Sequence, residues 1–352
     1  MLIINDPFRE ARVPYDNNRT RRARTGRRRG KPPIVYAAVD LGTNNCRLLM
    51  AKPSAGGFKV VGSFSRIVRL GEGMAESGHL SEAAMNRTLE ALKICASKIN
   101  SVAPARTRAV ATEACRSAAN RQIFVDRVKA ETGLDIETIS PKEEAVLTLE
   151  GCAPLLDREH PFGLVFDIGG GSVEVMFVET LEPSRPRLIE AMSLPFGVVT
   201  LAERHGHDLV AEDDYASMVD VVEGELAGFD ERHGISSRIA QDKVQMLGTS
   251  GTVTMLGGIY LNLPRYNRSR VDGLDMDFPA IAEINTRLAR MNGQERARHP
   301  CIGKERADLV VAGCAILEAV CRRWPAGRLR VADRGIREGL LLGMMTADGD
   351  AR

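Results

Sequence analysis

One short pattern occurs twice in the chain, and this repeat constrains the fold more than any other feature. Residues 34–51 and 164–178 each contain an apolar run that ends at an aspartate, then a turn of glycine and small polar residues, then a second apolar run. Each copy predicts a tight β-hairpin. The two aspartates, Asp40 and Asp167, lie 127 residues apart. The repeat therefore predicts a duplicated fold, with one phosphate-binding loop per half and the two loops facing each other across a cleft.

The turn of the second hairpin suits the binding of an anion. It is formed by Gly169, Gly170, Gly171 and Ser172. Three consecutive glycines allow positive φ and leave no side chains in the way, so backbone N–H groups can converge on a phosphate. Asp167, at the end of a buried strand, is costly to desolvate unless it is paired or lies near a metal ion, and Mg²⁺ beside phosphate is the usual partner. A plain hairpin with a flexible tip is the alternative that a lone glycine run leaves open.

Strands and helices alternate through both halves of the chain, as in an α/β protein. Together with the repeated hairpin, this organisation resembles the actin, sugar-kinase and Hsp70-ATPase (ASKHA) superfamily, whose fold is ribonuclease H-like. The resemblance implies two domains with a cleft between them, residues 33–155 and 156–335. It also implies that the last helix, residues 336–348, joins the first domain.

The first 31 residues differ in net charge from the rest of the chain. Ten of the 48 Lys and Arg residues, but only three of the 46 acidic ones, lie in residues 1–31, which leaves 38 basic and 43 acidic residues in the rest. Residues 1–32 are therefore expected to form a disordered basic tail, either simply solvated or loosely attracted to polyanions. The mildly acidic body argues against a protein that binds nucleic acid by charge, so we expect no specific nucleic-acid partner.

No apolar run is long enough for a membrane span, and residues 1–4 are too short for a secretory signal. The chain is therefore expected to be cytoplasmic, with no membrane partner. Its seven cysteines include no C-x-x-C pair. They are expected to be reduced core residues, neither disulfides nor zinc ligands.

A helix that begins at the junction of the two halves carries a candidate catalytic base. Ser140 is a natural N-cap, Pro141 fits the first helical position, and Glu143 at N3 is expected to complete a capping box. Glu144 has no such structural role, since it lies on a different helix face, shared with Leu147. It is a candidate general base, and a structural carboxylate is the alternative.

Two further stretches are ambiguous. The strand-to-helix turn at Gly248, Thr249, Ser250 and Gly251 presents N–H groups to an anion or a ribose, and tight packing explains its glycines equally well. Residues 264–304 are polar and are predicted to be irregular. Their basic side chains, with Lys142, could line a channel for a polyanion or form a solvated face: Arg265, Arg268, Arg270, Arg298 and Lys304.

Seven stretches, in this order, resemble the exopolyphosphatase/guanosine pentaphosphate phosphohydrolase (Ppx/GppA) family, in its short two-domain form. They are residues 39–47, 111–116, 139–145, 166–174, 193–197, 247–252 and 332–339. Two departures from the family pattern are Val173, where threonine is common, and Cys46 inside the first loop. Neither removes a charged group.

The resemblance assigns roles to residues of this sequence. It implies that Glu144 is the catalytic base, that Arg116 binds phosphate opposite it, and that Mg²⁺ is held by Asp167 and Glu174, with Asp40 as a further ligand. It also implies that phosphate is bound by both hairpin turns and by the turn at 248–251. The residues of the first hairpin turn that would bind it are Thr43, Asn44, Asn45 and Arg47.

The activity implied is that of an exopolyphosphatase, which hydrolyses the terminal phosphoanhydride of inorganic polyphosphate with Mg²⁺ and possible stimulation by K⁺. Three alternatives remain at this point: hydrolysis of guanosine pentaphosphate to the tetraphosphate, a kinase of the same superfamily, and a binding protein without activity. Retention of Glu144, Asp167 and Glu174 argues against the binding protein, because binding alone needs no base. Family members are often homodimers, so a homodimer is expected.

Overall fold

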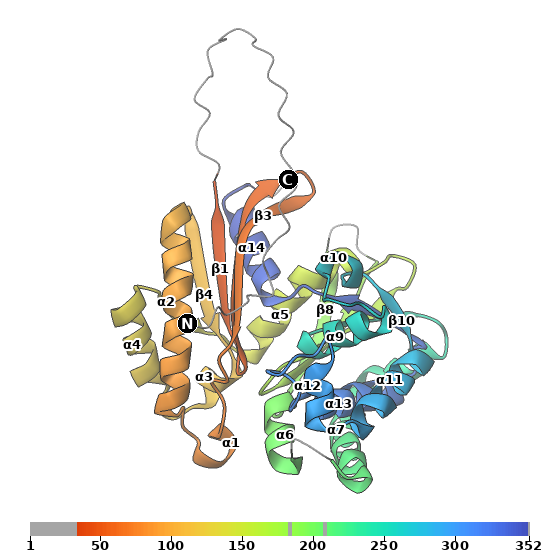
Figure 1. The fold of residues 1–352 in the computed structure, drawn as a ribbon. Helices are drawn as coiled ribbons and strands as arrows, with labels where there is room; N and C mark the ends of the chain where they lie inside the picture. Colours follow the sequence, from red (N-terminus) through yellow and green to blue (C-terminus); the bar gives the residue numbers. More distant parts are fainter. Residues whose placement is uncertain (1–33, 182–184, 207–209, 351–352) are drawn as a thin grey trace, which may run out of the picture. The chain divides into compact units, whose positions relative to one another are not determined.

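A computed structural model describes residues 34–181, 185–206 and 210–350 (Figure 1). The predicted basic tail, residues 1–32, lies outside the described residues. These described residues form one compact unit built around two β-sheets.

The first sheet has the strand order β3-β2-β1-β4-β5. Its strands are β1 Tyr36–Leu41, β2 Asn45–Ser54, β3 Gly57–Ile67, β4 Arg106–Ala111 and β5 Ile136–Thr138. Strands β1 to β3 form an antiparallel meander, and β4 and β5 continue the sheet parallel to β1. The predicted hairpin is β1–β2, in which Asp40 pairs with Arg47.

The second sheet has the order β10-β11-β9-β6-β7-β8. Its strands are β6 Phe162–Ile168, β7 Val173–Glu179, β8 Arg187–Leu194, β9 Val244–Thr249, β10 Asp275–Asp277 and β11 Arg328–Ala332. Its hairpin β6–β7 pairs Asp167 with Glu174, in the place where the first hairpin pairs Asp40 with Arg47. Strands β6 to β8 again form a meander followed by parallel β9 and β11. The same five-strand plan therefore occurs twice, which confirms the predicted duplicated α/β fold.

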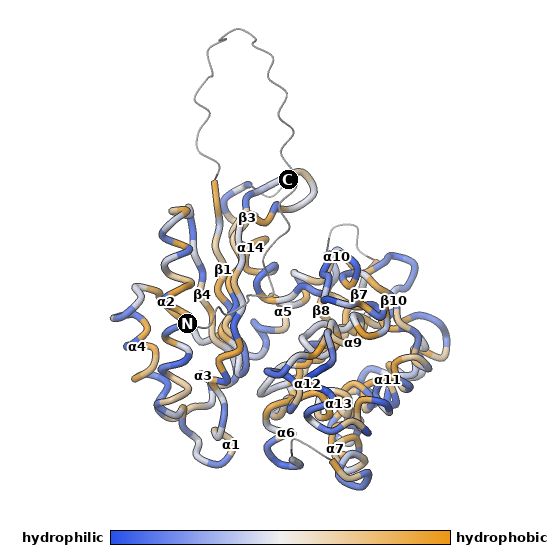
Figure 2. Tube along the Cα trace, viewed as in Figure 1, coloured by the Kyte–Doolittle hydropathy of each residue, from blue (hydrophilic) through white to orange (hydrophobic). Residues whose placement is uncertain are grey.

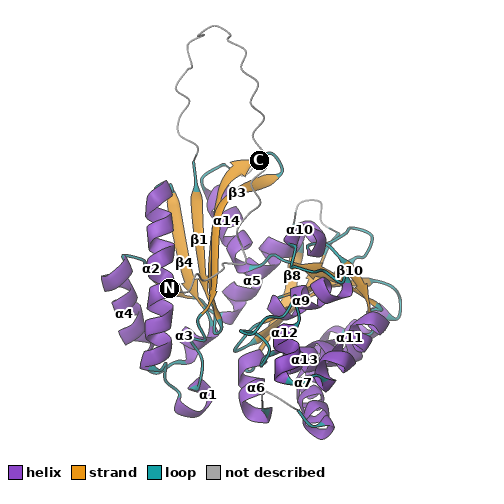
Figure 3. Ribbon diagram, viewed as in Figure 1, coloured by secondary structure: helices purple, strands orange, loops and turns teal. Residues whose placement is uncertain are grey.

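Each sheet is covered by helices on both faces (Figure 3). We call the first sheet with α1 to α4 the first lobe, and the second sheet with α6 to α13 the second lobe. The helices of the first lobe are α1 Met74–Ser77, α2 Glu82–Val102, α3 Glu113–Ser117 and α4 Arg121–Thr132. Those of the second lobe are α6 Val198–His205, α7 Glu212–His233, α8 Ile235–Ile239, α9 Gly251–Tyr260, α10 Arg268–Val271, α11 Phe278–Arg290, α12 Gly293–Arg298 and α13 Val310–Arg323.

Side-chain alternation explains why β1 is buried on both faces. Ala37, Val39 and Leu41 point into the core beneath α2 and α4, whereas Tyr36 and Ala38 point into the core beneath α14. Successive side chains of a strand face opposite sides, so a continuous apolar run fits a strand covered on both faces. This arrangement fixes Asp40 at the end of a rigid central strand.

Two helices, α5 Pro141–Cys152 and α14 Ile336–Ala347, lie between the sheets, and a short 3-10 turn at Ala153–Leu155 follows α5. Helix α14 packs on β1 and on α5, and α5 also packs on β7 and β8. A Cβ built on Gly339 would overlap the carbonyl oxygen of Leu147, and one built on Gly151 would overlap that of Gly335. Glycine is therefore required for this close approach, which we call the α5–α14 crossing.

The prediction that residues 264–304 are irregular is wrong. They contain α10, β10, α11 and α12. Helix α11 buries Ile281, Ile284 and Leu288 with helical spacing, and Figure 2 shows apolar and polar positions alternating along it. The cysteines are core residues for the most part, as predicted, since six of the seven free cysteines are buried. Among the described residues, no helix combines the length and the apolar composition needed to cross a bilayer.

Candidate active site

The tips of the two hairpins touch. A Cβ built on Gly170 would lie 3.1 Å from Thr43 Cβ and 3.2 Å from Asn44 N, and one built on Gly171 would lie 2.6 Å from Thr43 Oγ1. None of Gly169, Gly170 and Gly171 has a positive φ, so that part of the prediction is wrong. Gly170 and Gly171 are needed because the tip of one hairpin packs directly on the other, whereas a Cβ on Gly169 would meet the carbonyl oxygen of Ser172 within its own turn, at 2.7 Å.

The first turn of α6 holds the glycine turn in place. The backbone N–H groups of Val198 and Val199 donate to the carbonyl oxygens of Gly169 and Gly170, at 3.0 and 2.8 Å. A Cβ on Gly197 would lie 2.6 Å from the carbonyl carbon of Gly170. Because of these hydrogen bonds, the carbonyl groups of Gly169 and Gly170 point towards α6.

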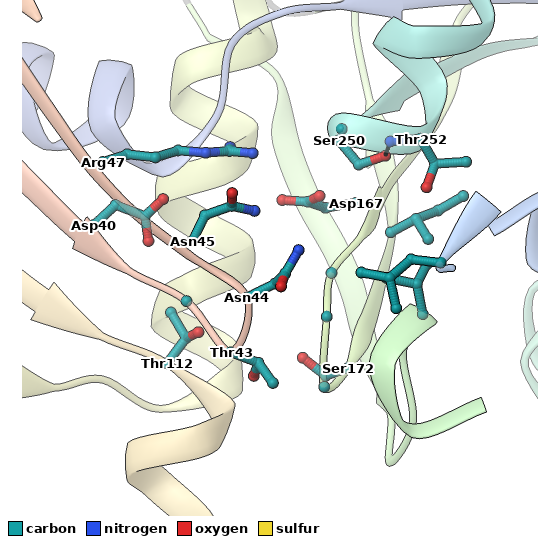
Figure 4. Close-up of a pocket in the computed structure, with 18 of the residues that line it drawn as sticks. Asp40, Thr43, Asn44, Asn45, Arg47, Thr112, Asp167, Ser172, Ser250 and Thr252 are labelled. Atoms are coloured by element: carbon teal, nitrogen blue, oxygen red, sulfur yellow. Dashed lines mark hydrogen bonds between the residues drawn. The ribbon is translucent and has the colours of Figure 1, made fainter. Parts of the chain in front are cut away.

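A pocket lies at the meeting point of the hairpin tips and receives side chains from both lobes (Figure 4). Most of the predicted site residues line it, namely Asp40, Thr43, Asn44, Asn45, Arg47, Glu144, Asp167, Gly169, Gly170, Gly171, Ser172, Ser250 and Gly251. Four do not line it, namely Arg116, Glu174, Gly248 and Thr249. In Figure 4, Arg47 extends from β2 towards Ser250, and the carboxylate of Asp167 lies opposite Asn45.

The two repeat aspartates are buried carboxylates. Burial and the nearby Glu174 together raise the pKa of Asp167 to about 7, against the smaller opposing effect of Arg47. Burial also raises the pKa of Asp40, against the effect of Arg47. Neither carboxylate forms a hydrogen bond or an ion pair with another side chain in the described part of the chain. Arg47 lies near enough to oppose these shifts but is paired directly with neither carboxylate, so burial is only partly compensated.

The oxygen atoms in this pocket suit Mg²⁺. The side-chain oxygens Oδ1 of Asn44 and Asn45 are buried without a hydrogen-bond partner, close to the Asp40 and Asp167 carboxylates. Within the described residues, no group of three or more His, Cys, Asp or Glu side chains converges as a ready metal cluster. Mg²⁺ is commonly held by one or two carboxylates together with water and phosphate oxygens, so this donor set fits it.

Helix α5 places Glu144 in the pocket. Ser140 caps the helix by accepting from the N–H of Glu143 at 3.2 Å, and Pro141 occupies the first turn, as predicted. The capping box is not completed, because the Glu143 carboxylate instead accepts from Arg108 at 3.0 Å. Glu144 is only 6% exposed, and its carboxylate reaches the pocket wall. Burial raises its pKa well above the ordinary value and Glu174 raises it further, while Arg116 opposes both.

Arg116 lies beside Glu144 rather than opposite it, contrary to the prediction. Its Nη1 donates to Glu144 Oε2 at 3.1 Å and to the carbonyl of Ile139 at 2.8 Å, and its Nε and Nη2 donate to Glu113 at 3.0 and 2.6 Å. Four donated hydrogen bonds leave the guanidinium little freedom to move. Arg116 thus orients the Glu144 carboxylate and supplies its counter-charge.

Glu174 lies beneath the glycine turn and outside the pocket wall. It is 2% exposed, and its carboxylate accepts a hydrogen bond from Ser193 Oγ at 2.9 Å. Burial raises its pKa, and hydrogen bonds from Ser172 and Ser193 oppose the shift. From this position Glu174 acts on the pocket through its charge, which raises the pKa values of Asp167 and Glu144.

The turn at 248–251 contributes only its second half to the pocket. Gly248 packs against the ring of Phe166, where a Cβ would come within 2.6 Å, and the Thr249 hydroxyl donates to the carbonyl of Arg334 at 2.6 Å. Ser250 has the strained φ of 138° and caps α9 by accepting from two backbone N–H groups. Close packing thus explains Gly248, and Ser250 and Gly251 remain at the pocket.

The sequence reasoning missed Arg306, which lines the pocket from the second lobe. A Cβ built on Gly251 would lie 3.9 Å from Arg306 Nη1 and 4.0 Å from Arg47 Nη2, so the two guanidinium groups converge there. Burial lowers the pKa of Arg306, and the charge of Arg47 lowers it further. Neither arginine forms an ion pair within the described residues. No motif marks Arg306, and its place in the charged stretch of residues 304–308 resembles an ordinary surface loop.

The raised pKa of Asp167 predicts how stability depends on pH in metal-free protein. The folded protein keeps this proton up to about pH 7, whereas the ordinary value of 3.8 applies to the unfolded chain. The protonated Asp167 side chain therefore stabilises the folded state fully below pH 4. This stabilisation, up to about 4 kcal/mol, is lost as the pH rises through 7. Urea denaturation in EDTA should show a smaller loss of stability between pH 5 and 8 for Asp167→Asn than for wild type. If the free energy of unfolding changes equally with pH in both proteins, the raised pKa does not belong to Asp167.

Solved structures of other proteins share this fold. The Ppx/GppA family member from Aquifex aeolicus is 28% identical, with a TM-score of 0.74 over 90% of this chain and 99% of that chain. An exopolyphosphatase from Cytophaga hutchinsonii is 26% identical, with a TM-score of 0.79 over 90% of this chain and 100% of that chain. An exopolyphosphatase-like protein is 27% identical, with a TM-score of 0.81 over 89% and 98% of the two chains.

A profile of the Ppx/GppA phosphatase family matches residues 49–348, which is most of the chain. The match includes α5 with Glu144, the whole β6–β7 hairpin and the turn at 248–251, all of which line the pocket, whereas the first hairpin turn lies before the matched residues. The family assignment therefore rests on the elements that form the pocket as well as on the overall fold. This chain belongs to the Ppx/GppA phosphatase family.

Proposed function

We propose that this protein is an exopolyphosphatase that hydrolyses the terminal phosphoanhydride of inorganic polyphosphate and releases orthophosphate. The observation that carries the proposal is the combination in one pocket of a buried, oriented carboxylate, Glu144, with two unpaired arginines, Arg47 and Arg306. Hydrolysis of a phosphoanhydride requires neutralised charge, in-line geometry and a positioned water molecule. The pocket offers groups for each requirement.

The cationic side of the pocket binds the phosphate chain. Arg47 and Arg306 converge beside Gly251 from opposite lobes, so one phosphate can accept hydrogen bonds from both guanidinium groups. Thr43 at the first hairpin tip adds a hydroxyl donor and is nearly buried, whereas the Ser172 hydroxyl of the second tip already donates to Glu174. Because little water reaches these groups, their interaction with a phosphate is strong and requires little reorganisation.

The acidic side of the pocket activates water. Glu144 would accept a hydrogen bond from a water molecule and take its proton as the oxygen attacks the terminal phosphorus. Arg116 holds the Glu144 carboxylate in one orientation through the 3.1 Å contact. Asp40 and Asp167, with the amide oxygens of Asn44 and Asn45, would hold Mg²⁺. When bound, Mg²⁺ supplies charge neutralisation on the phosphate oxygens.

The lining of the pocket favours an inorganic chain over a nucleotide. Among the described residues that line the pocket, none is aromatic, so no ring is present to stack on a base. Helix α9, where a kinase of this superfamily would need a nucleoside site, is tightly packed. A Cβ on Gly257 would lie 3.0 Å from Val271, and one on Gly258 would lie 3.1 Å from Cys301. The tight packing of α9 counts against a kinase. The lack of an aromatic ring in the described pocket lining counts against guanosine pentaphosphate as the preferred substrate.

The test is phosphate release from long-chain polyphosphate, tripolyphosphate and guanosine pentaphosphate, each with Mg²⁺ and with EDTA, in sodium and in potassium buffers. We expect Mg²⁺-dependent release from long polyphosphate, and only weak competition by the nucleotide in a mixed assay. If phosphate is released faster from guanosine pentaphosphate than from polyphosphate, the nucleotide is the preferred substrate and this proposal is wrong. Transfer of phosphate to an alcohol or carboxylate, with no free orthophosphate, would contradict hydrolysis altogether.

A further inference from the structure

A short segment after β3 is tied to the tip of the first hairpin. The N–H groups of Val68 and Arg69 donate to the carbonyl of Asn44 at 2.8 and 3.1 Å, and that of Gly71 donates to the carbonyl of Thr43 at 3.0 Å. Arg69 has a φ of 49°, a left-handed conformation that is unfavourable for arginine. The backbone of Arg69 is therefore held in a fixed position next to the pocket.

The Arg69 side chain crosses to the second lobe. Its Nη1 and Nη2 donate to the two carboxylate oxygens of Asp308 at 2.7 and 3.0 Å, and Nη2 also donates to the carbonyl of Glu305 at 3.2 Å. Glu305 and Asp308 stand on either side of Arg306 in the sequence. One arginine of the first lobe thus holds the backbone segment that carries Arg306.

That segment needs such a contact because the pocket brings two like charges together. Arg47 and Arg306 converge near Gly251, and each lacks an acidic partner within the described residues. Their repulsion favours movement of residues 303–309 away from the first lobe when no anion is bound. The bidentate contact with Asp308 opposes this movement. A second contact, from Gly73 N to Glu203 Oε1 at 2.9 Å, joins the lobes nearby.

We propose that Arg69 and Asp308 are positioning residues, which hold Arg306 opposite Arg47 so that the anion site exists before the substrate arrives. The proposal rests on the proposed function, because it takes the Arg47–Arg306 site as the phosphate-binding part of the pocket. Neither Arg69 nor Asp308 lines the pocket. Their effect on binding must therefore pass through Arg306.

A double-mutant cycle tests this route, with the binding of tripolyphosphate measured by calorimetry in EDTA so that no turnover is needed. We expect Asp308→Asn to weaken binding about 5- to 10-fold in the wild-type background and by less than about 2-fold in an Arg306→Gln background. Arg69→Asn should behave in the same way. Asparagine tolerates the left-handed backbone at this position, so the variant should fold normally.

The matched control is Arg127→Gln, which removes an arginine of similar exposure that pairs with Glu82 and Glu131 within the first lobe, far from the pocket. Its tripolyphosphate affinity should not change. Equal losses from Asp308→Asn in both backgrounds, or no loss in either, would overturn the positioning role while leaving the proposed function intact. Failure of the wild-type protein to bind tripolyphosphate would instead refute the anion site, and the positioning role with it.

Discussion

Replacing Glu144 by glutamine should lower kcat for polyphosphate hydrolysis by about 10²- to 10⁴-fold. Glutamine keeps the size of the side chain and can still accept a hydrogen bond from Arg116 Nη1, but it cannot take a proton from water. Phosphate release under saturating substrate gives kcat, and calorimetry with tripolyphosphate gives the affinity. The affinity should stay within a few-fold of wild type, because Arg47 and Arg306 are untouched.

Glu143→Gln is the matched control for this prediction. Glu143 is the preceding residue of the same helix, but its side chain is 42% exposed and pairs with Arg108 outside the pocket lining. Its replacement should leave kcat within about 2-fold of wild type, since only a surface ion pair is lost. If Glu144→Gln hydrolyses polyphosphate as fast as Glu143→Gln does, the base is another group.

Replacing Gly339 by alanine should destabilise the protein by about 3 kcal/mol or more, although only one methyl group is added. The new Cβ would overlap the carbonyl oxygen of Leu147 in α5, and neither backbone can move without separating the two helices. Helix α5 carries Glu144, so hydrolysis by the remaining folded protein should fall as well. Urea denaturation gives the change in the free energy of unfolding.

Gly343→Ala, on the same helix, provides the contrast. A Cβ at Gly343 would meet only the Glu150 carboxylate, at 3.9 Å. Alanine is favoured over glycine inside a helix, so this variant should be more stable than wild type by about 0.5–1 kcal/mol. Should Gly339→Ala prove as stable as Gly343→Ala, the α5–α14 crossing is looser than described.

Local sequence signals predicted the hairpins and the helix that carries Glu144. The continuous apolar runs that end at Asp40 and Asp167 specify strands, and Ser140 with Pro141 specifies where α5 begins. These features depend on neighbouring residues in the chain. For the same reason, the capping role of Glu143 could not be predicted correctly, because its competitor, Arg108, lies on a distant strand.

Residues whose roles depend on packing between distant segments were misjudged or missed. Gly170 and Gly171 are required by contact with Thr43 and Asn44, which the local sequence cannot reveal. Arg306 gains its significance only when folding brings it close to Arg47. Helix α11, by contrast, was overlooked although the sequence carries its signal, namely Asp277 as N-cap and apolar residues at helical spacing at 281, 284 and 288.

The two hairpins differ at one paired position, and this difference gives the pocket a direction. Opposite the aspartate, the first hairpin carries Arg47 and the second carries Glu174. Two identical halves would accept a linear polyanion either way round. With a cation on one side and an acid on the other, the proposed polyphosphate chain should enter with its body along the arginine side and its last phosphate next to Glu144. Hydrolysis would then proceed inward from the chain end, one phosphate at a time.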